Sequence, residues 1–180
     1  MKAAFNSQLL EGQTQTYRLD DITPTVFLLF VQWLYSQEFK IISLGNPGNH
    51  WDDAPPAFET QHSEFVQLWI LADRFLIPRL QNQVMREIER AFKLQVTTAW
   101  IPHAYAGTSP DSPLRYLAVD ISLYEISSSW VKKHPEHFPV EILLDLAERV
   151  VLSNGSVADT YIHRRKRYDY YVKKDTAGDA

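Results

Sequence analysis

The sequence predicts an α+β fold that is predominantly helical, and three observations lead to this prediction. Apolar residues recur at helical spacing through most of the 180 residues, whereas two-residue alternation is confined to two short segments. The helical and strand patterns do not alternate along the chain, which argues against a parallel nucleotide-binding sheet. Hydrophobic residues make up 45% of the chain, so a substantial core can form.

The two strand-like segments define a small predicted sheet. A short helix, or the end of a longer one, is predicted over residues 2–10, and Gly12 follows it where a left-handed helix end is typical. Polar and apolar side chains alternate over residues 13–19, which predicts a strand. A second short strand is predicted over residues 38–42.

The segment from Pro24 to Tyr35 is predicted to be the central helix. Thr23 supplies a capping hydroxyl in front of it, and proline suits the first helical position. Apolar residues then cover almost the whole circumference of this helix. We therefore expect it to be buried on several sides, at the centre of the domain.

A long loop and two further helices follow the central helix. Residues 43–61 are rich in Gly, Pro, Asn and Asp, which predicts a mobile loop. His62 or Ser63 can then cap a helix that ends at Ile77, because the residue before a proline avoids helical angles. Pro78 opens the next helix. We expect these two aromatic-rich helices to clasp the central helix.

Three more helical segments are predicted in the second half. Residues 97–107 form a short helix, and Leu114 begins a strongly amphipathic one that Trp130 and Val131 are candidates to continue. Pro139 begins the last helix. Its expected buried face consists of Ile142, Leu143, Leu146 and Val150.

Composition and charge exclude several classes of protein. The chain contains no cysteine, which rules out disulfides, thiolate metal sites and a cysteine nucleophile. A net charge of −4 gives no basic field for nucleic acid. The most apolar run, residues 26–35, is too short to span a membrane, and the N-terminus lacks the apolar stretch of a signal peptide. We expect a soluble intracellular protein, cytoplasmic or nuclear, that binds neither nucleic acid nor membranes.

No pattern predicts catalysis, a cofactor or a small-molecule substrate. The paired carboxylates at 20–21 and 52–53 fall in predicted turns, without an apolar pocket to raise a pKa. His134 and His137 are a candidate metal pair with Glu136 between them, but we expect Pro135 to stop a regular helix from presenting both rings together. We therefore predict no catalytic residues and no metal. An enzyme or a metal-binding protein is the alternative from another class.

A basic run at residues 163–167, followed by three tyrosines, allows two interpretations. It could serve nuclear import or bind an acidic partner. It could also be the solvated end of a helix, which we favour because charge runs usually face water.

Two segments of the chain resemble parts of the BTB/POZ domain. In the first, a helix end is followed by a strand, an acidic turn and a buried helix. The residues that carry this resemblance are Ala4-Phe5-Asn6-Ser7, Glu11-Gly12-Gln13, Tyr17-Arg18-Leu19-Asp20-Asp21, Val26-Phe27 and Trp33-Leu34-Tyr35-Ser36. The second joins two short helices through an Ala-Asp-basic-aromatic run, Leu71-Ala72-Asp73-Arg74-Phe75-Leu76-Ile77-Pro78-Arg79-Leu80. The resemblance covers about residues 1–92. Two later segments, at 112–120 and 137–147, are similar to the helical tail of many fungal BTB-domain proteins.

The resemblance implies a partial BTB/POZ fold with a small sheet remnant over residues 1–94. A helical extension over residues 95–153 and a polar tail over residues 154–180, expected to fray, complete the predicted organisation. The implied function is that of a protein–protein interaction module, a scaffold or adaptor and not an enzyme. Its implied partners are other proteins, including another BTB chain.

A complete BTB domain has a strand pair and a helix ahead of the point where this sequence begins. Those elements carry much of the sheet and most of the usual dimer surface. We therefore expect that the chain is a fragment or truncated product, or that a partner supplies the rest. An uncovered strand edge and apolar face would make the chain less stable than a complete domain and prone to associate.

A narrower implied function is that of a substrate adaptor for a cullin-based ubiquitin ligase. Cullin-binding adaptors often carry an apolar residue two before an acidic one, just ahead of the Ala-Asp helix. The matching stretch here is Glu64-Phe65-Val66, with the two residue types exchanged, which weakens the cullin hypothesis. Glu64, Phe65 and Val66 are candidate partner-binding residues, as is Trp51 in the polar loop, because interface hot spots favour Trp.

Overall fold

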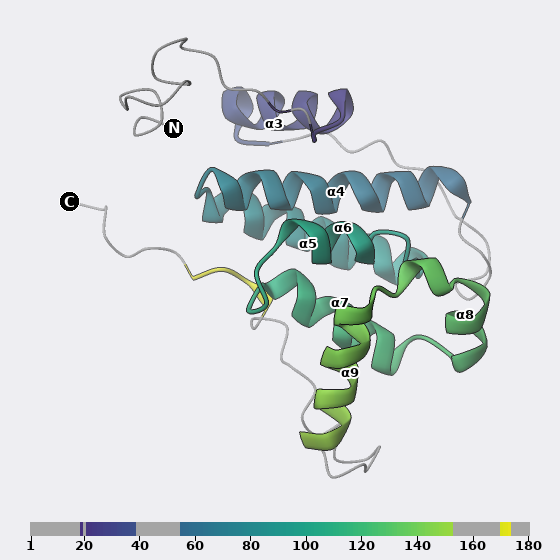
Figure 1. Cartoon of the computed structure of the whole chain (residues 1–180). Coiled ribbons are helices and arrows are strands. Elements are labelled where there is room, and N and C mark those ends of the chain that lie inside the picture. The colour runs from purple at the N-terminus through teal and green to yellow at the C-terminus, as the bar shows by residue number, and fades with distance from the viewer. Residues whose placement is uncertain (1–18, 20, 39–54, 153–169, 174–180) are drawn as a thin grey trace.

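A computed structural model of the chain describes residues 19, 21–38, 55–152 and 170–173 (Figure 1). Within these residues all regular secondary structure is helical, so the predominantly helical character of the prediction is confirmed. The expected strands at 13–19 and 38–42 lie outside the described residues except for Leu19 and Glu38, and neither of those two is in a strand.

The first described helix, α3, spans Pro24–Ser36. Its start agrees with the sequence prediction, since the Thr23 hydroxyl accepts a hydrogen bond of 3.3 Å from the Val26 N–H. The helix closes at Gln37, whose φ of 59° is left-handed and whose N–H donates to the Trp33 carbonyl at 2.7 Å. Local capping chemistry therefore fixes both ends of α3.

The expected central position of α3 is wrong. The helix lies along one edge of the molecule, and only Val26, Phe30 and Trp33 are buried (Figure 1). Its opposite side carries exposed apolar side chains. Apolar residues surround the helix, but other helices bury only one of its sides.

The central element is instead α4, which spans Pro56–Arg74. In Figure 1 it lies between α3 on one side and α5 and α6 on the other, and it contacts all three. The predicted loop over 43–61 is therefore wrong in its last part, because Pro56 and not His62 or Ser63 begins the helix. Phe58 fell within the predicted loop, but in the structure it belongs to α4 and is buried.

A tight turn joins α4 to α5, which spans Pro78–Leu94. The Leu76 N–H donates to the Asp73 carbonyl and the Ile77 N–H to the Ala72 carbonyl, both at 2.9 Å. This is the Schellman pattern of helix ends, with Leu76 at the left-handed position, φ 54°. The predicted helix start at Pro78 is confirmed, whereas α4 ends at Arg74, before its predicted end at Ile77. Helices α4 and α5 pack as antiparallel neighbours.

Residues 95–98 run without helical structure through the core, where Gln95, Thr97 and Thr98 are almost fully buried. Helix α6 therefore spans only Ile101–Gly107 and begins later than the predicted start at Thr97. Helix α7 spans Pro113–Tyr124, with the Ser112 hydroxyl accepting from the Leu114 N–H at 3.3 Å.

The candidate continuation of α7 through Trp130 and Val131 is wrong. The helix ends at Tyr124, and a separate helix, α8, spans Ser128–Lys133 after an N-cap at Ser127. A 3-10 turn, η1, follows over Pro135–His137.

The last described helix, α9, spans Val140–Leu152 and begins next to Pro139 as expected. Its predicted buried face is only partly correct. Ile142 is fully buried and Leu146 half-buried, but Leu143 and Val150 are 45% and 42% exposed. This helix therefore packs along a narrower stripe than its sequence suggests.

One continuous core joins all of these helices. It includes residues on both sides of the predicted boundary at 94/95, so no break in packing occurs there. It also includes Tyr170 from the segment expected to fray. Residues 170–173 lie against the helices, so the prediction of a frayed tail does not hold for these four residues.

Candidate functional site

The outward side of α3 is the first candidate site. Five apolar residues follow one another there at positions that share a helix face, and four of them are exposed. We call this set the outer stripe; it consists of Phe27, Leu28, Val31, Leu34 and Tyr35. Leu28 is 66% exposed and Tyr35 90%. No residue of α3 is charged, so the stripe is apolar without charged neighbours on its own helix.

The inner side of α3 is held firmly, which fixes the direction of the outer stripe. The Trp33 indole N–H donates to the Gln83 side-chain oxygen on α5 at 2.9 Å, and Phe30 stacks on Phe75 with ring centroids 5.4 Å apart. Asp21 and Arg74 form a two-pronged ion pair just before α3, and hydrogen bonds from the guanidinium lower the pKa of Asp21.

Of the residues predicted to bind a partner, the three that the structure describes do not form an exposed surface. Phe65 and Val66 are 3% and 1% exposed and belong to the core between α4 and its neighbours. In this structure neither side chain can reach a partner protein. Glu64 is half-buried on the same helix, and Trp51 lies outside the described residues. The stretch that would have to contact a cullin is thus largely occupied by intramolecular packing.

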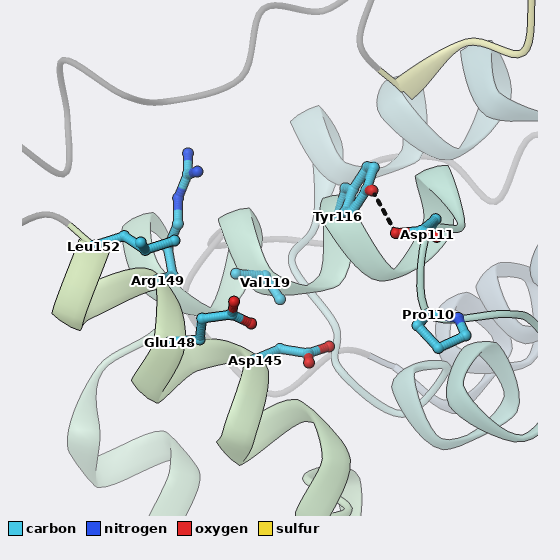
Figure 2. Close-up of a pocket in the computed structure, with 8 residues that line it drawn as sticks. All are labelled: Pro110, Asp111, Tyr116, Val119, Asp145, Glu148, Arg149 and Leu152. Atoms are coloured by element: carbon cyan, nitrogen blue, oxygen red, sulfur yellow. Dashed lines mark hydrogen bonds between the residues drawn. The ribbon is translucent and has the colours of Figure 1, made fainter.

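The second candidate is a small cleft of about 280 Å³ between α7 and α9 (Figure 2). It is lined by Pro110, Asp111, Tyr116, Val119, Asp145, Glu148, Arg149 and Leu152. Four of its polar groups have partners. Asp145 accepts from the Tyr105 hydroxyl at 2.6 Å, Arg149 lies 4.0 Å from Asp120, and the Tyr116 hydroxyl donates to Asp111 at 3.4 Å (Figure 2). These contacts join α9 to the rest of the molecule, and no sequence pattern predicted them.

Tyr105 and Arg115 extend this polar network to α6. The Arg115 guanidinium lies 4.6 Å above the Tyr105 ring and donates to the Tyr105 and Thr108 carbonyls at 2.9 and 2.5 Å. These carbonyls lie at the C-terminal end of α6, where a cation is favourable. Burial and the neighbouring Asp145 carboxylate raise the pKa of Tyr105, so its phenol remains a hydrogen-bond donor.

The third candidate is the turn after α8, where His134, Glu136 and His137 converge. A single Glu136 oxygen, Oε1, lies 3.6 Å from His134 Nδ1 and 3.6 Å from His137 Nε2. Among the residues that the structure describes, this is a set of three metal-ligating side chains whose ligand atoms all lie within 4.8 Å of one another. The two imidazole rings stack with centroids 5.1 Å apart.

No regular helix presents the two histidines, as expected from Pro135, but their rings converge all the same. Pro135 does end α8, but it begins the 3-10 turn, in which side chains three apart eclipse one another. His134 precedes this turn and His137 ends it. The proline thus brings the two rings together through a 3-10 turn, whereas the prediction from the sequence considered only an α-helix.

Buried polar groups from other segments hold this cluster. The Thr98 Oγ1 lies 2.8 Å from His137 Nδ1 and accepts a 3.0 Å hydrogen bond from the Trp130 indole N–H. The Trp130 ring also packs on His134, with centroids 4.5 Å apart. Partial burial lowers the pKa of His137, and hydrogen bonding of its own backbone N–H lowers the pKa of Glu136. The roles of Thr98 and Trp130 could not be predicted from the sequence, because only the fold brings them to the turn.

These observations define the chain as a helical bundle with an apolar outer stripe on α3 and a His-Glu-His turn between α8 and α9. Neither the family models nor the curated proteins nor the solved structures contain a match to it. In the part of the chain that the structure describes, none of the helices combines the length and apolar character needed to cross a membrane.

Proposed function

We propose that this chain is a non-catalytic protein–protein interaction module, a scaffold or adaptor built on part of a BTB/POZ fold. The resemblance of residues 1–92 suggests the fold, including a small sheet in residues outside the described range. The observation that carries the proposal is the outer stripe of α3, which presents a row of apolar side chains to solvent. The cullin-adaptor hypothesis gains no support, because Phe65 and Val66 are buried.

The occupant that fits the outer stripe is a second copy of the same chain. The stripe carries no charge, so two copies can face each other across a two-fold axis without placing like charges together. Leu28 and Tyr35 lie one heptad apart, as in residues that interdigitate between packed helices. Burying one such leucine contributes about 1.5–3 kcal/mol. The proposal therefore predicts weak to moderate self-association through α3.

Sedimentation equilibrium of the purified chain tests this proposal, with two matched variants. Leu28→Glu places a carboxylate in the outer stripe, and Leu144→Glu makes the same change on α9, at a leucine that is 64% exposed compared with 66% for Leu28. In Figure 1 the two helices lie at opposite ends of the molecule. Both variants remove similar apolar exposure and add the same charge, so the comparison isolates the position.

We expect the wild type to form a concentration-dependent dimer that Leu28→Glu weakens by at least about tenfold, whereas Leu144→Glu leaves it unchanged. Circular dichroism checks that both variants retain their helices. A wild-type chain that remains a monomer up to high micromolar concentration would contradict the proposal. Equal weakening by both variants would also contradict it.

A further inference from the structure

We propose that His134, Glu136 and His137 form a binding site for a divalent transition-metal ion, with Zn²⁺ as the ion that the ligand set fits best. This inference goes beyond the proposed function and does not depend on the outer stripe. It rests on the types of ligand, their separation and the groups that hold them.

The separations match a tetrahedral ion. Zn²⁺ binds histidine nitrogens and carboxylate oxygens at about 2.0–2.2 Å, which places neighbouring ligand atoms roughly 3.3–3.6 Å apart. Glu136 Oε1 lies 3.6 Å from both His134 Nδ1 and His137 Nε2. Two of the three ligand pairs therefore already have the spacing of an occupied site.

The ligand set favours zinc over the alkaline-earth ions. Two imidazoles and one carboxylate suit a borderline-soft ion, whereas Ca²⁺ and Mg²⁺ prefer sites made of oxygen ligands. Three protein ligands leave one tetrahedral position, which water can fill. Glu136 faces solvent, with 63% of its side chain exposed, so the ion has an entry path on that side.

The neighbouring hydrogen bonds are compatible with His137 as a ligand. The Trp130 indole can only donate, so it occupies one lone pair of Thr98 Oγ1. The second lone pair can accept from His137 Nδ1, which lies 2.8 Å away. With the proton on Nδ1, the Nε2 atom that faces Glu136 carries the lone pair needed for a metal. Hydrogen bonds of this kind commonly orient metal-binding histidines.

One adjustment accompanies binding. The two imidazole planes are only 9° from parallel, so their lone pairs run side by side instead of meeting at one point. Rotation of one ring about its side-chain bond would bring both onto the ion. His134 is the ring that we expect to turn, because His137 is fixed by Thr98. The stacking of His134 on Trp130 would change with it.

Isothermal titration of the purified, metal-free chain with Zn²⁺ tests the site. Three variants accompany the wild type: Glu136→Gln, His137→Asn and the control His103→Asn, which changes an exposed histidine on α6. Glu136→Gln is the most informative change, because this exposed side chain can be altered without disturbing the core. Circular dichroism checks that each variant remains folded.

We expect the wild type to bind one equivalent of Zn²⁺ with a micromolar or lower dissociation constant. Glu136→Gln and His137→Asn should each weaken binding by at least about tenfold, and His103→Asn should leave it unchanged. A second measurement follows the imidazole C–H signals by NMR during the titration. Those of His134 and His137 should shift, whereas those of the buried His62 should not.

Two results would overturn the proposal. One is the absence of a one-to-one, micromolar interaction between Zn²⁺ and the wild-type chain. The other is binding that Glu136→Gln and His137→Asn retain at the wild-type level, which would place the ion elsewhere on the chain.

Discussion

The side chain of Asn82 on α5 exchanges two hydrogen bonds with the backbone of Val172, each 2.8 Å long. Its amide nitrogen donates to the Val172 carbonyl, and its oxygen accepts from the Val172 N–H. The two residues are 90 positions apart in the sequence. Tyr170 and Tyr171, which precede Val172, donate to Asp120 and Glu89, so residues 170–172 are bound to the helices much as a peptide would be.

Replacing Asn82 should release this segment. Asn82→Ala removes both hydrogen bonds, which contribute about 0.5–1.5 kcal/mol each. We expect the Val172 amide to exchange with solvent at least about tenfold faster, while amides in the centre of α4 are little affected. Hydrogen–deuterium exchange measures both. Arg86→Ala, an exposed change one turn further along α5, is the control and should leave the Val172 amide protected.

Stability should fall with acid because of His62 on α4. This side chain is 1% exposed, and neither ring nitrogen has a hydrogen-bond partner within the described residues. Burial lowers the pKa of His62 from 6.5 to about 4. Below pH 6.5 the unfolded chain takes up a proton that the folded chain refuses until about pH 4. The free energy of unfolding should therefore decrease as the pH falls through this window, by up to roughly 3 kcal/mol from this group.

His62→Phe should remove that part of the pH dependence, since it keeps a ring stacked on Phe92, 5.1 Å away in the wild type. Urea unfolding at pH 7 and pH 5 gives the comparison. His103→Asn, which changes an exposed histidine, should retain the wild-type difference between the two pH values. The same loss of stability in His62→Phe as in the wild type would refute this assignment.

The contact between α4 and α6 should be sensitive to a single methyl group. A Cβ atom added at Gly107 would lie 2.7 Å from Ile70 Cδ1 and 3.0 Å from its Cγ2. Gly107→Ala should therefore lower the free energy of unfolding by about 1–3 kcal/mol, as overpacking typically does. Thermal and urea unfolding both report this change.

A double-mutant cycle separates this overpacking from any effect of alanine itself. Ile70→Val removes the closest atom, Cδ1, and should recover part of the loss when it is combined with Gly107→Ala. Strict additivity of the two changes would show that the steric explanation is incorrect.

The turn between α4 and α5 offers a stabilising change. Leu76 has a left-handed φ of 54° and is 84% exposed, so it bears a conformational cost and buries little apolar surface. Leu76→Gly should raise the free energy of unfolding by about 0.5–1 kcal/mol, because glycine adopts this conformation readily. Leu94→Gly serves as the control at a helical, exposed leucine, and should be destabilising by up to about 1 kcal/mol. Destabilisation by both changes would argue against strain at Leu76.

Local chemistry made much of the helical framework predictable. Thr23 and Pro24 begin α3, and Ile77 and Pro78 separate α4 from α5, as their sequences indicate. Capping hydroxyls and prolines act on backbone groups within four residues, so these boundaries need no knowledge of the rest of the chain.

The sequence by itself therefore determined that the chain is mainly helical and where several helices begin and end. The tertiary structure decided that α4 and not α3 is central, that Phe65 and Val66 face the core, and that the His134 and His137 rings meet over Glu136. The reason is physical. Helix capping depends on nearby backbone atoms, whereas the burial of a side chain, and its meeting with side chains from other segments, depend on which distant element packs against it. An apolar helix face looks the same in the sequence whether another helix or solvent lies against it.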